Sequence, residues 1–318
     1  MLKTLNIRII HYKTVAPCRL LRNRTSFSAK SYAAFRPSYP PVLYKTLLAY
    51  HKLPTPSGKL LDLGCGHGLI SRELSPHFKS TLAIDPSAGM VNQAKDMTKD
   101  PKIEFKHGSA EDLDFVPDSS LDMAVAGQAA HWFDYTKVWP NLARVVKSGG
   151  TMAFWGYKDN ILLGYEEATT IMEHFVYGFG EVAPGVEGMG KYWEQPGRNI
   201  LRNLLRSVTP PESDWEGVER LEHEPGQKGQ EERIAWQTKK MKLGEVEAYT
   251  RTFSCFTGWK EAYPESRSRA EGGEGDVVDI MWDHMIDAVP EWKAMGDKWK
   301  EADVVSDWGT YILMARRR

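Results

Sequence analysis

A glycine-rich turn in the segment KLLDLGCGHGLISREL (59–74) offers backbone that could approach a ligand closely. Gly64, Gly66 and Gly68 separate an apolar run from a helix-like one. Because glycine has no Cβ, the backbone N–H groups of such a strand–turn–helix can reach a ligand. The dinucleotide pattern G-x-G-x-x-G needs a third glycine where this chain has Leu69. The spacing argues against a pyrophosphate cradle, and a purely structural tight turn is the alternative to a ligand site.

Asp85 is the second residue whose position suggests binding chemistry. It ends the predicted strand STLAI (80–84) and stands 21 residues after Gly64. An acid at this place in a nucleotide-binding sheet holds the two hydroxyls of a ribose. Asp85-Pro86-Ser87 also suits the cap of the following helix, and the two roles are compatible. The pattern therefore favours a ligand that contains ribose.

Short apolar segments alternate with helical ones after residue 58, which predicts a parallel sheet covered by helices. The predicted strands are 59–63, 80–84, 102–106, 121–126 and 151–155, and the helices between them are 69–74, 88–95 and 135–146. From about residue 157 the chain is rich in Trp, Gly and Glu, which predicts a mainly helical insertion that includes 166–179 and 199–208. An amphipathic helix (276–289) follows. GTYILMA (309–315) is predicted to close the sheet at an edge, in a hairpin with ADVV (302–305).

Composition narrows the class of protein. With 318 residues and 42% apolar side chains, the chain can form one or two domains. It lacks an apolar run of about 18 residues, so we expect no membrane span, and we expect a cytoplasmic location. The three cysteines, Cys18, Cys65 and Cys255, are too few and too scattered for a disulfide framework or a zinc pattern, and we expect no metal.

The charges are distributed unevenly along the chain. Residues 1–61 contain 11 Lys and Arg residues and no Asp or Glu, whereas the remainder is strongly acidic. The basic beginning allows a disordered terminus, a mitochondrial targeting segment or a tail for anionic partners. The acidic body disfavours nucleic acid as a partner. We expect a monomer that acts on a small molecule.

Several motifs together resemble a class I S-adenosylmethionine-dependent methyltransferase. They are DLGCGHG, the acid at position 85, HGSAEDL (107–113), GQAAHWF (127–133) and KSGG (147–150). More narrowly, FRPSYP, AHWF, YWEQPGR, KLGEVEAYTRTFSCFTGW and the final ARRR resemble the fungal trans-aconitate methyltransferase group. The resemblance implies an α/β, Rossmann-like fold: a doubly wound, mostly parallel seven-stranded sheet with a mainly helical insertion.

The resemblance also implies a division of the chain. The expected parts are a basic extension (1–24), lid helices (25–58), the cofactor-binding core (59–156), a helical insertion that caps the acceptor (157–275), and a final helix with edge strands (276–318).

The cofactor implied by the resemblance is S-adenosylmethionine. Asp62, Gly64 and Gly66 would hold its methionine end, chiefly through backbone, and Asp85 would bind the ribose. Gln128 would lie beside the reacting sulfonium. The full expected set is Asp62, Gly64, Cys65, Gly66, Asp85, Pro86, Met90, Ser109, Ala110, Glu111 and Gln128, in which Ser109 to Glu111 would contact adenine.

The acceptor decides whether the enzyme needs a base. A carboxylate, with a pKa of about 4, is already an anion at neutral pH, whereas a phenol with a pKa of about 10 gains from one. His131 is the candidate base, and a packed histidine is the alternative. A carboxylate acceptor would favour arginine as its partner. The expected acceptor residues are Tyr32, Arg36, Tyr39, Trp132, Arg198 and Arg251, and surface or structural salt bridges are the alternative for each arginine.

We therefore expect O-methylation of a small carboxylic acid. The alternatives are O-methylation of a phenolic or other secondary metabolite with His131 as base, and a methyltransferase-like binding protein without turnover. A nicotinamide-dependent oxidoreductase is disfavoured by Leu69.

Overall fold

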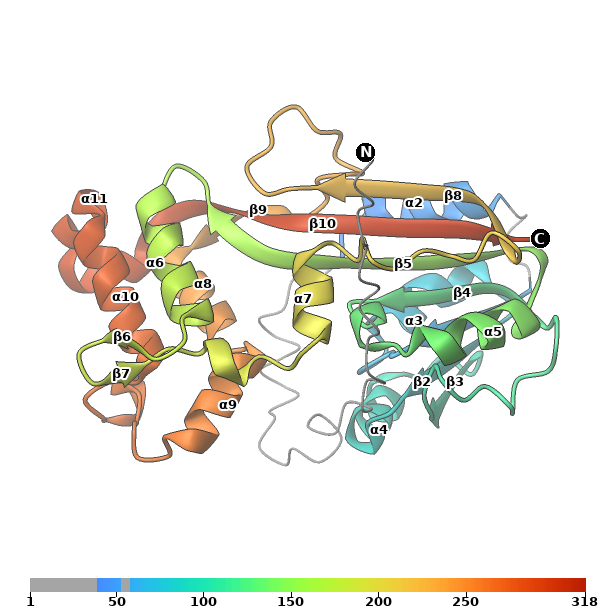
Figure 1. Cartoon of the computed structure of the whole chain (residues 1–318), viewed down its shortest axis with the longest axis horizontal. Coiled ribbons are helices and arrows are strands. Elements are labelled where there is room, and N and C mark those ends of the chain that lie inside the picture. The colour runs from blue at the N-terminus through green and yellow to red at the C-terminus, as the bar shows by residue number, and fades with distance from the viewer. Residues whose placement is uncertain (1–38, 53–57) are drawn as a thin grey trace, which may run out of the picture.

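A sheet of eight strands runs through the computed structural model, which describes residues 39–52 and 58–318 (Figure 1). The strand order is β3-β2-β1-β4-β5-β10-β8, and β9 also pairs with β10. β1 to β5 are parallel, whereas β10 is antiparallel to β5, β8 and β9. The strands are β1 (Lys59–Leu63), β2 (Ser80–Asp85), β3 (Ile103–His107), β4 (Leu121–Gly127), β5 (Val146–Leu162), β8 (Trp215–His223), β9 (Thr238–Lys242) and β10 (Asp303–Arg317). This arrangement confirms the predicted α/β fold with a mostly parallel sheet.

Helices cover both faces of the sheet because apolar side chains of each strand point alternately to either side. Leu60 of β1 packs in a core cluster with Leu43 of α2, whereas the next residue, Leu61, packs in a second cluster with Val138 and Leu142 of α5. The helices of this part are α2 (Pro41–His51), α3 (Leu69–Leu74), α4 (Ala88–Met97), α5 (Tyr135–Val145) and α7 (Gly197–Arg202). The sheet is therefore doubly wound.

β5 and β10 continue beyond the parallel part of the sheet into a second lobe of helices, seen at the left of Figure 1. This lobe contains α6 (Glu166–Tyr177), α8 (Leu243–Thr250), α9 (Ser254–Ala262), α10 (Val277–Ala288), α11 (Pro290–Ala294) and the small hairpin of β6 (Glu181–Ala183) and β7 (Val186–Glu187). Short 3-10 helices are η1 (Ser75–His77), η2 (Ala130–Trp132), η3 (Gly190–Tyr192), η4 (Arg269–Glu271) and η5 (Gly296–Glu301). One apolar cluster, which includes Trp155 and Trp308, joins the two lobes.

The C-terminal part of the chain differs from the sequence prediction. The predicted hairpin of ADVV and GTYILMA is wrong, because both segments belong to the single strand β10. β10 also lies inside the sheet, between β5 and β8, and not at its edge. Residues 306–308 lie within the strand and do not form a turn. Asp307 is buried there, and it accepts hydrogen bonds from His223, Gly226 and Thr238.

The segment 157–275 also differs from the expected helical insertion. It contributes β8 and β9 to the main sheet, and β5 runs on to Leu162. The helix predicted over 199–208 ends at Arg202, because Leu204 and Leu205 adopt positive φ angles of 51° and 58°. Within 39–52 and 58–318, no helix has both the length and the apolar character needed to cross a bilayer.

Candidate active site

The glycine turn between β1 and α3 is built so that two of its glycines cannot carry a side chain. Gly64, Gly66 and Gly68 have φ angles of +70°, +53° and +83°, the left-handed region that glycine enters without strain. A Cβ on Gly64 would lie 2.6 Å from the Cβ of Ala129, and one on Gly68 would lie 2.7 Å from the ring of Phe105. The turn therefore fits closely against the loop after β4 and against β3.

Gly66 is different, because no described atom lies within 4 Å of the place its Cβ would take. Its backbone N–H donates to Oδ2 of Asp85 at 2.9 Å. The backbone N–H of Ser87 donates to Oδ1 of the same carboxylate at 2.8 Å, and Ser87 caps α4. Burial raises the pKa of Asp85, and these two hydrogen bonds oppose the rise. The open space over Gly66 thus borders a buried carboxylate at the end of β2.

Asp62 supplies a second buried carboxylate under the same turn. Its side chain is 0% exposed, and its Oδ2 accepts a hydrogen bond from Ser71 Oγ at 2.5 Å. Its Oδ1 has no hydrogen-bond partner. Burial raises the pKa of Asp62 to about 7. A buried carboxylate with an unpartnered oxygen fits a ligand that brings a hydrogen-bond donor or a cation, such as the ammonium of the methionine end of S-adenosylmethionine.

The loop after β3 carries the residues expected at adenine. Ala110 is buried, and Ser109 is half-buried. The Glu111 carboxylate accepts a hydrogen bond from the backbone N–H of Asp134 at 3.0 Å, so it links this loop to the start of α5. Gly108 N–H donates to the carbonyl of Asp85 at 3.1 Å, which brings the loop beside the end of β2. Two further expected residues flank that strand end, exposed Pro86 and half-buried Met90.

Gln128, directly after β4, holds the backbone of β5 with its side chain. Its Nε2 donates to the carbonyl of Tyr157 at 2.9 Å, and its Oε1 accepts from the N–H of Tyr157 at 2.9 Å. A Cβ on Gly156 would lie 2.6 Å from that Oε1, so glycine makes room for the contact. Gln128 itself has a φ of 55°, a strained angle for a residue other than glycine.

His131 and Trp132 follow in η2, with ring centroids 4.7 Å apart. His131 is buried. Gly197, the first residue of α7, lies against the indole of Trp132, since a Cβ there would meet the ring at 2.4 Å. This contact places Arg198 next to the loop that carries the candidate base. Tyr39 lies elsewhere, with its ring 5.8 Å from that of Trp155.

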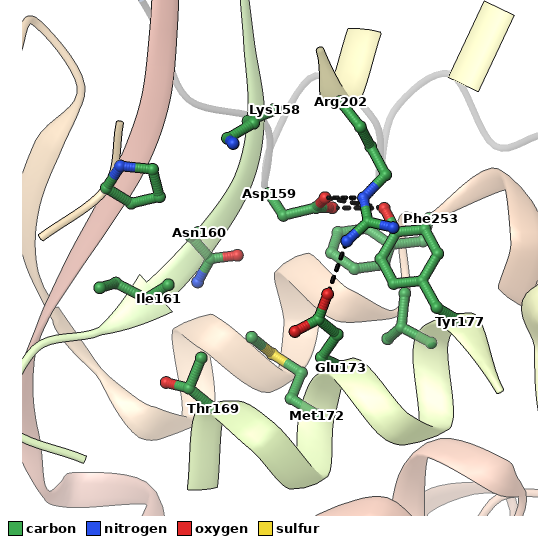
Figure 2. Close-up of a pocket in the computed structure, with 12 residues that line it drawn as sticks. Lys158, Asp159, Asn160, Ile161, Thr169, Met172, Glu173, Tyr177, Arg202 and Phe253 are labelled. Atoms are coloured by element: carbon green, nitrogen blue, oxygen red, sulfur yellow. Dashed lines mark hydrogen bonds and ion pairs between the residues drawn. The ribbon is translucent and has the colours of Figure 1, made fainter. Parts of the chain in front are cut away.

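A cavity of about 190 Å³ lies between β5 and α6 (Figure 2). Asp159 binds both Arg198 and the hydroxyl of Tyr177, and Arg202 reaches its Oδ2 at 3.3 Å. Arg202 also binds Glu173 at 2.6 Å. Arg202, Asp159, Glu173 and Tyr177 line the cavity, whereas Arg198 lies behind them and stacks on a tryptophan. A polar cluster thus forms one wall of the cavity.

Nothing in the sequence singles out Asp159, Glu173 or Tyr177, because their partners are far away in the chain. One signal was available: Arg198 and Arg202 are four residues apart on α7 and so lie on the same face of that helix.

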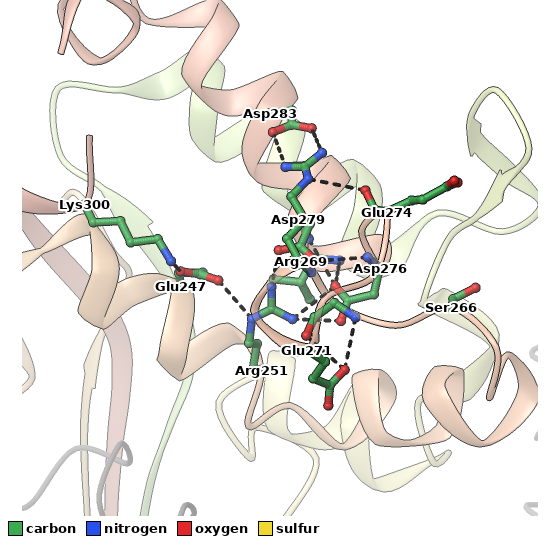
Figure 3. Close-up of polar contacts among 12 residues, drawn as sticks. Glu247, Arg251, Ser266, Arg269, Glu271, Glu274, Asp276, Asp279, Asp283 and Lys300 are labelled. Carbon is green, nitrogen blue, oxygen red and sulfur yellow. Dashed lines mark hydrogen bonds and ion pairs between the residues drawn. The ribbon is translucent and has the colours of Figure 1, made fainter. Parts of the chain in front are cut away.

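Arg251 does not present a free guanidinium (Figure 3). It binds Glu247 at 2.9 Å, Asp276 at 2.8 Å and Asp279 at 2.6 Å, and so fastens α8 to the start of α10. This is the structural role that the sequence left open as an alternative. The two remaining expected acceptor residues, Tyr32 and Arg36, lie outside the described residues, as do the proposed basic extension and part of the lid.

Cys65 and His67 are the other residues of the turn with titratable side chains. Burial raises the pKa of the Cys65 thiol far above its usual value, which disfavours the reactive thiolate. Burial also lowers the pKa of His67. In the part of the chain that the structure describes, no group of three or more His, Cys, Asp or Glu side chains is arranged to hold a metal ion.

The fold and the turn resemble those of class I methyltransferases, and comparison with known proteins agrees. Residues 61–154 match the family described as "Methyltransferase domain". The matched segment begins in β1 and ends in β5, so it contains the glycine turn, Asp85 and Gln128.

Two curated proteins and one solved structure illustrate the likeness. The chain is 27% identical over 308 residues to a probable S-adenosylmethionine-dependent methyltransferase of Saccharomyces cerevisiae, CRG1, covering 92% of this chain and 97% of the yeast protein. It is 32% identical over 132 residues to the methyltransferase gedG of Aspergillus terreus, of which it covers 41%. The structure of a proposed type II methyltransferase from Anaeromyxobacter dehalogenans is 23% identical, with a TM-score of 0.59 over 89% of this chain and 98% of that one. The last likeness concerns the fold alone. The domain match and the yeast relative support the expected cofactor, S-adenosylmethionine.

Proposed function

We propose that this protein transfers the methyl group of S-adenosylmethionine to an oxygen atom of a small carboxylic acid. The observation that carries the proposal is the glycine turn, in which the unpartnered oxygen of Asp62 and the open side of Gly66 lie within the segment that matches the methyltransferase family. When bound there, the cofactor supplies a methyl group on a sulfonium, which is its own leaving group.

The residues of this chain bind and orient the reactants. The Asp62 carboxylate would receive the ammonium of the methionine end, and Asp85 would receive the ribose hydroxyls with the lone pairs left over from its two backbone hydrogen bonds. Gln128 fixes the neighbouring strand through Tyr157. Alignment of the acceptor behind the methyl group and exclusion of water supply most of the rate enhancement in such a transfer.

A carboxylate acceptor suits this site because it needs no base. The acceptor is ionised at neutral pH, so its oxygen attacks directly and no proton has to move. The guanidinium of Arg202 at the cavity wall can pair with a second carboxylate of the acceptor.

His131 favours a second candidate, the O-methylation of a phenol. It stands three residues after Gln128 in η2, at the carboxyl end of β4, where a base could take the proton of a hydroxyl. In that case His131→Gln abolishes most of the activity, whereas with a carboxylic acid the variant keeps most of it.

The identity of the product separates these possibilities. Cell extract is incubated with the protein and methyl-deuterated S-adenosylmethionine, and labelled products are found by mass spectrometry. A carboxylic acid gives a methyl ester that mild alkali hydrolyses, whereas a phenol gives a stable ether. Labelled ester is the expected result. Cofactor binding with no labelled product in any extract contradicts the enzyme and supports a binding protein.

A further inference from the structure

We propose that the cavity between β5 and α6 is the acceptor site and that Glu173 holds Arg202 in the free enzyme in the place that a substrate carboxylate takes. This inference rests on the proposed methyl transfer and names the part of the protein that selects the acceptor. Its ligand is a small molecule with two or more carboxylates, one to be methylated and one to be held.

The cavity is built by an irregularity in the longest pair of strands. Tyr157 faces Thr310 and Asn160 faces Trp308, so β5 takes three residue steps where β10 takes two. Such a bulge re-aims the side chains of the extra residues, and bulges gather beside active sites. Lys158 and Asp159 occupy the bulge and line the cavity.

β10 has a glycine, Gly309, opposite this bulge. A Cβ on Gly309 would lie 2.5 Å from the side chain of Lys158, so only glycine leaves room for that lysine. Lys158 in turn binds Glu224 and is thereby neutralised. The bulge is therefore supported from the neighbouring strand.

The cavity wall has one more guanidinium than half-buried carboxylates, so one positive charge can pair with an exchangeable anion. Two guanidiniums, Arg198 and Arg202, share the single carboxylate of Asp159. Arg198 is the more deeply buried of the two and also binds Tyr177. Glu173 completes the charge balance from the rim, bound only to Arg202 among the contacts that the structure describes for it.

Glu173 forms a weak ion pair with Arg202 because it lies at the protein surface. Its side chain is 59% exposed, and exposed ion pairs contribute little because water and salt screen them. A substrate carboxylate inside the cavity is screened less by water and salt than Glu173 is, so its attraction to Arg202 is stronger. Figure 2 shows Glu173 and Arg202 meeting across the cavity from α6 and α7.

The rest of the lining suits a short carbon skeleton. Ile161, Met172, Val176 and Phe253 provide apolar surface beside the charged wall. A volume of about 190 Å³ is below the range of about 300–1,000 Å³ typical of sites for drug-sized ligands, so the acceptor is small.

Strand β5 connects the cavity with the expected position of the methyl donor. Gln128, beside the glycine turn, holds the backbone of Tyr157. Asp159 follows two residues farther along β5, roughly 7 Å away in an extended strand. On this inference, one end of a small acceptor lies at the methyl group and the other is held at Arg202.

Binding without turnover tests the inference. The protein is saturated with S-adenosylhomocysteine, and succinate, tricarballylate, citrate and trans-aconitate are titrated in by calorimetry. Glu173→Gln is expected to bind one or more of these acids about two- to fivefold more tightly than the unchanged protein, because the internal competitor is gone. Arg202→Gln is expected to bind the same acids at least about tenfold more weakly.

Two matched variants control for general effects. Glu167→Gln removes the same charge from the exposed side of α6, and Arg233→Gln removes an exposed guanidinium that binds Glu231 outside the cavity. Both are expected to bind the acids as the unchanged protein does. Equal effects of Glu167→Gln and Glu173→Gln, or no acid binding in either the unchanged protein or Glu173→Gln, overturns the inference. Failure to bind S-adenosylhomocysteine is a different result and contradicts the proposed function itself.

Discussion

The side-chain amide of Gln128 makes two hydrogen bonds to the backbone of Tyr157, one through Nε2 and one through Oε1, each 2.9 Å long. The contact joins the end of β4, where the methyl donor is expected, to the part of β5 that leads into the bulge at Lys158 and Asp159. Gln128 thus positions the acceptor cavity relative to the glycine turn.

Shortening the Gln128 side chain should weaken the binding of the acceptor without weakening the binding of the cofactor. Gln128→Asn keeps a residue that tolerates positive φ but cannot reach Tyr157. We expect the KM for the acceptor to rise by about tenfold and the affinity for S-adenosylmethionine to change by less than about threefold. Steady-state kinetics and calorimetry measure the two quantities, and an equal loss in both contradicts this role.

Gly66→Ala tests the open side of the turn. The new Cβ meets no described atom, so the change costs about 1 kcal/mol of unfolding free energy from its positive φ and fills space meant for the cofactor. Gly149→Ala is a matched control, because Gly149 also has a positive φ, +77°, and open surroundings. Both variants should lose similar stability in urea unfolding. Only Gly66→Ala should bind S-adenosylmethionine more than about tenfold more weakly, and equal affinities would place the cofactor elsewhere.

The binding of the cofactor is expected to change the protonation of the Asp62 carboxyl. Burial raises the pKa of this carboxyl to about 7 in the folded protein, so the folded state keeps a proton that the unfolded chain loses near pH 4. Stability contributed by the protonated carboxyl is therefore complete below about pH 4 and is lost as the pH rises towards 7. A cation bound beside Asp62 lowers its pKa and expels the proton.

Calorimetry in two buffers with different ionisation enthalpies measures that proton. We expect S-adenosylmethionine binding to release about half a proton at pH 7 and less at pH 8.5, where the carboxyl is already ionised. Asp62→Asn should release about half a proton fewer than the unchanged protein at pH 7, because the amino group of the ligand contributes equally in both. Identical buffer dependence in the two proteins would mean that Asp62 does not face the charged end of the cofactor.

Arg251→Gln is expected to destabilise the helical lobe without affecting the cofactor site. It leaves the buried carboxylate of Asp276 and the nearby Asp279 without their cation, at a cost of about 3 kcal/mol of unfolding free energy. Arg269→Gln is the control, because Arg269 and its partner Asp283 are each about half exposed and the loss should stay below about 1 kcal/mol (Figure 3). Chemical denaturation measures both. Equal stability losses would show that Arg251 is not a structural residue.

The sequence predicted the parallel part of the fold because its strands are buried on both faces. Such strands are continuous apolar runs, as in LDMAVA, and glycine or an acid marks where they end. β8 was missed because, among the described residues, it pairs with β10 alone and its sequence, WEGVERLEH, is rich in charged side chains. A strand with a free side can carry charges that a helix would also carry, so periodicity does not distinguish them.

The cofactor turn could be predicted because its residues are neighbours in the sequence. The polar wall of the cavity could not, because its residues come from distant parts of the chain. Asp62, Gly64 and Gly66 act within one short local motif. Arg198 instead meets Asp159, which lies 39 residues away in the sequence, and only the folded chain shows which arginine is already paired. The strained φ of Gln128 was likewise invisible, since glutamine carries no signal for that conformation.

The binding of S-adenosylmethionine to Asp85→Asn tests the central claim most directly. Asp85 lies at the end of β2 with its carboxylate turned to Gly66, and the amide in its place can accept only through one oxygen. Asp96→Asn, on the exposed side of α4, is the matched control. By isothermal titration, we expect the unchanged protein and Asp96→Asn to bind S-adenosylmethionine alike and Asp85→Asn to bind at least about tenfold more weakly. Absence of binding in the unchanged protein, or equal affinity in all three, would contradict the account.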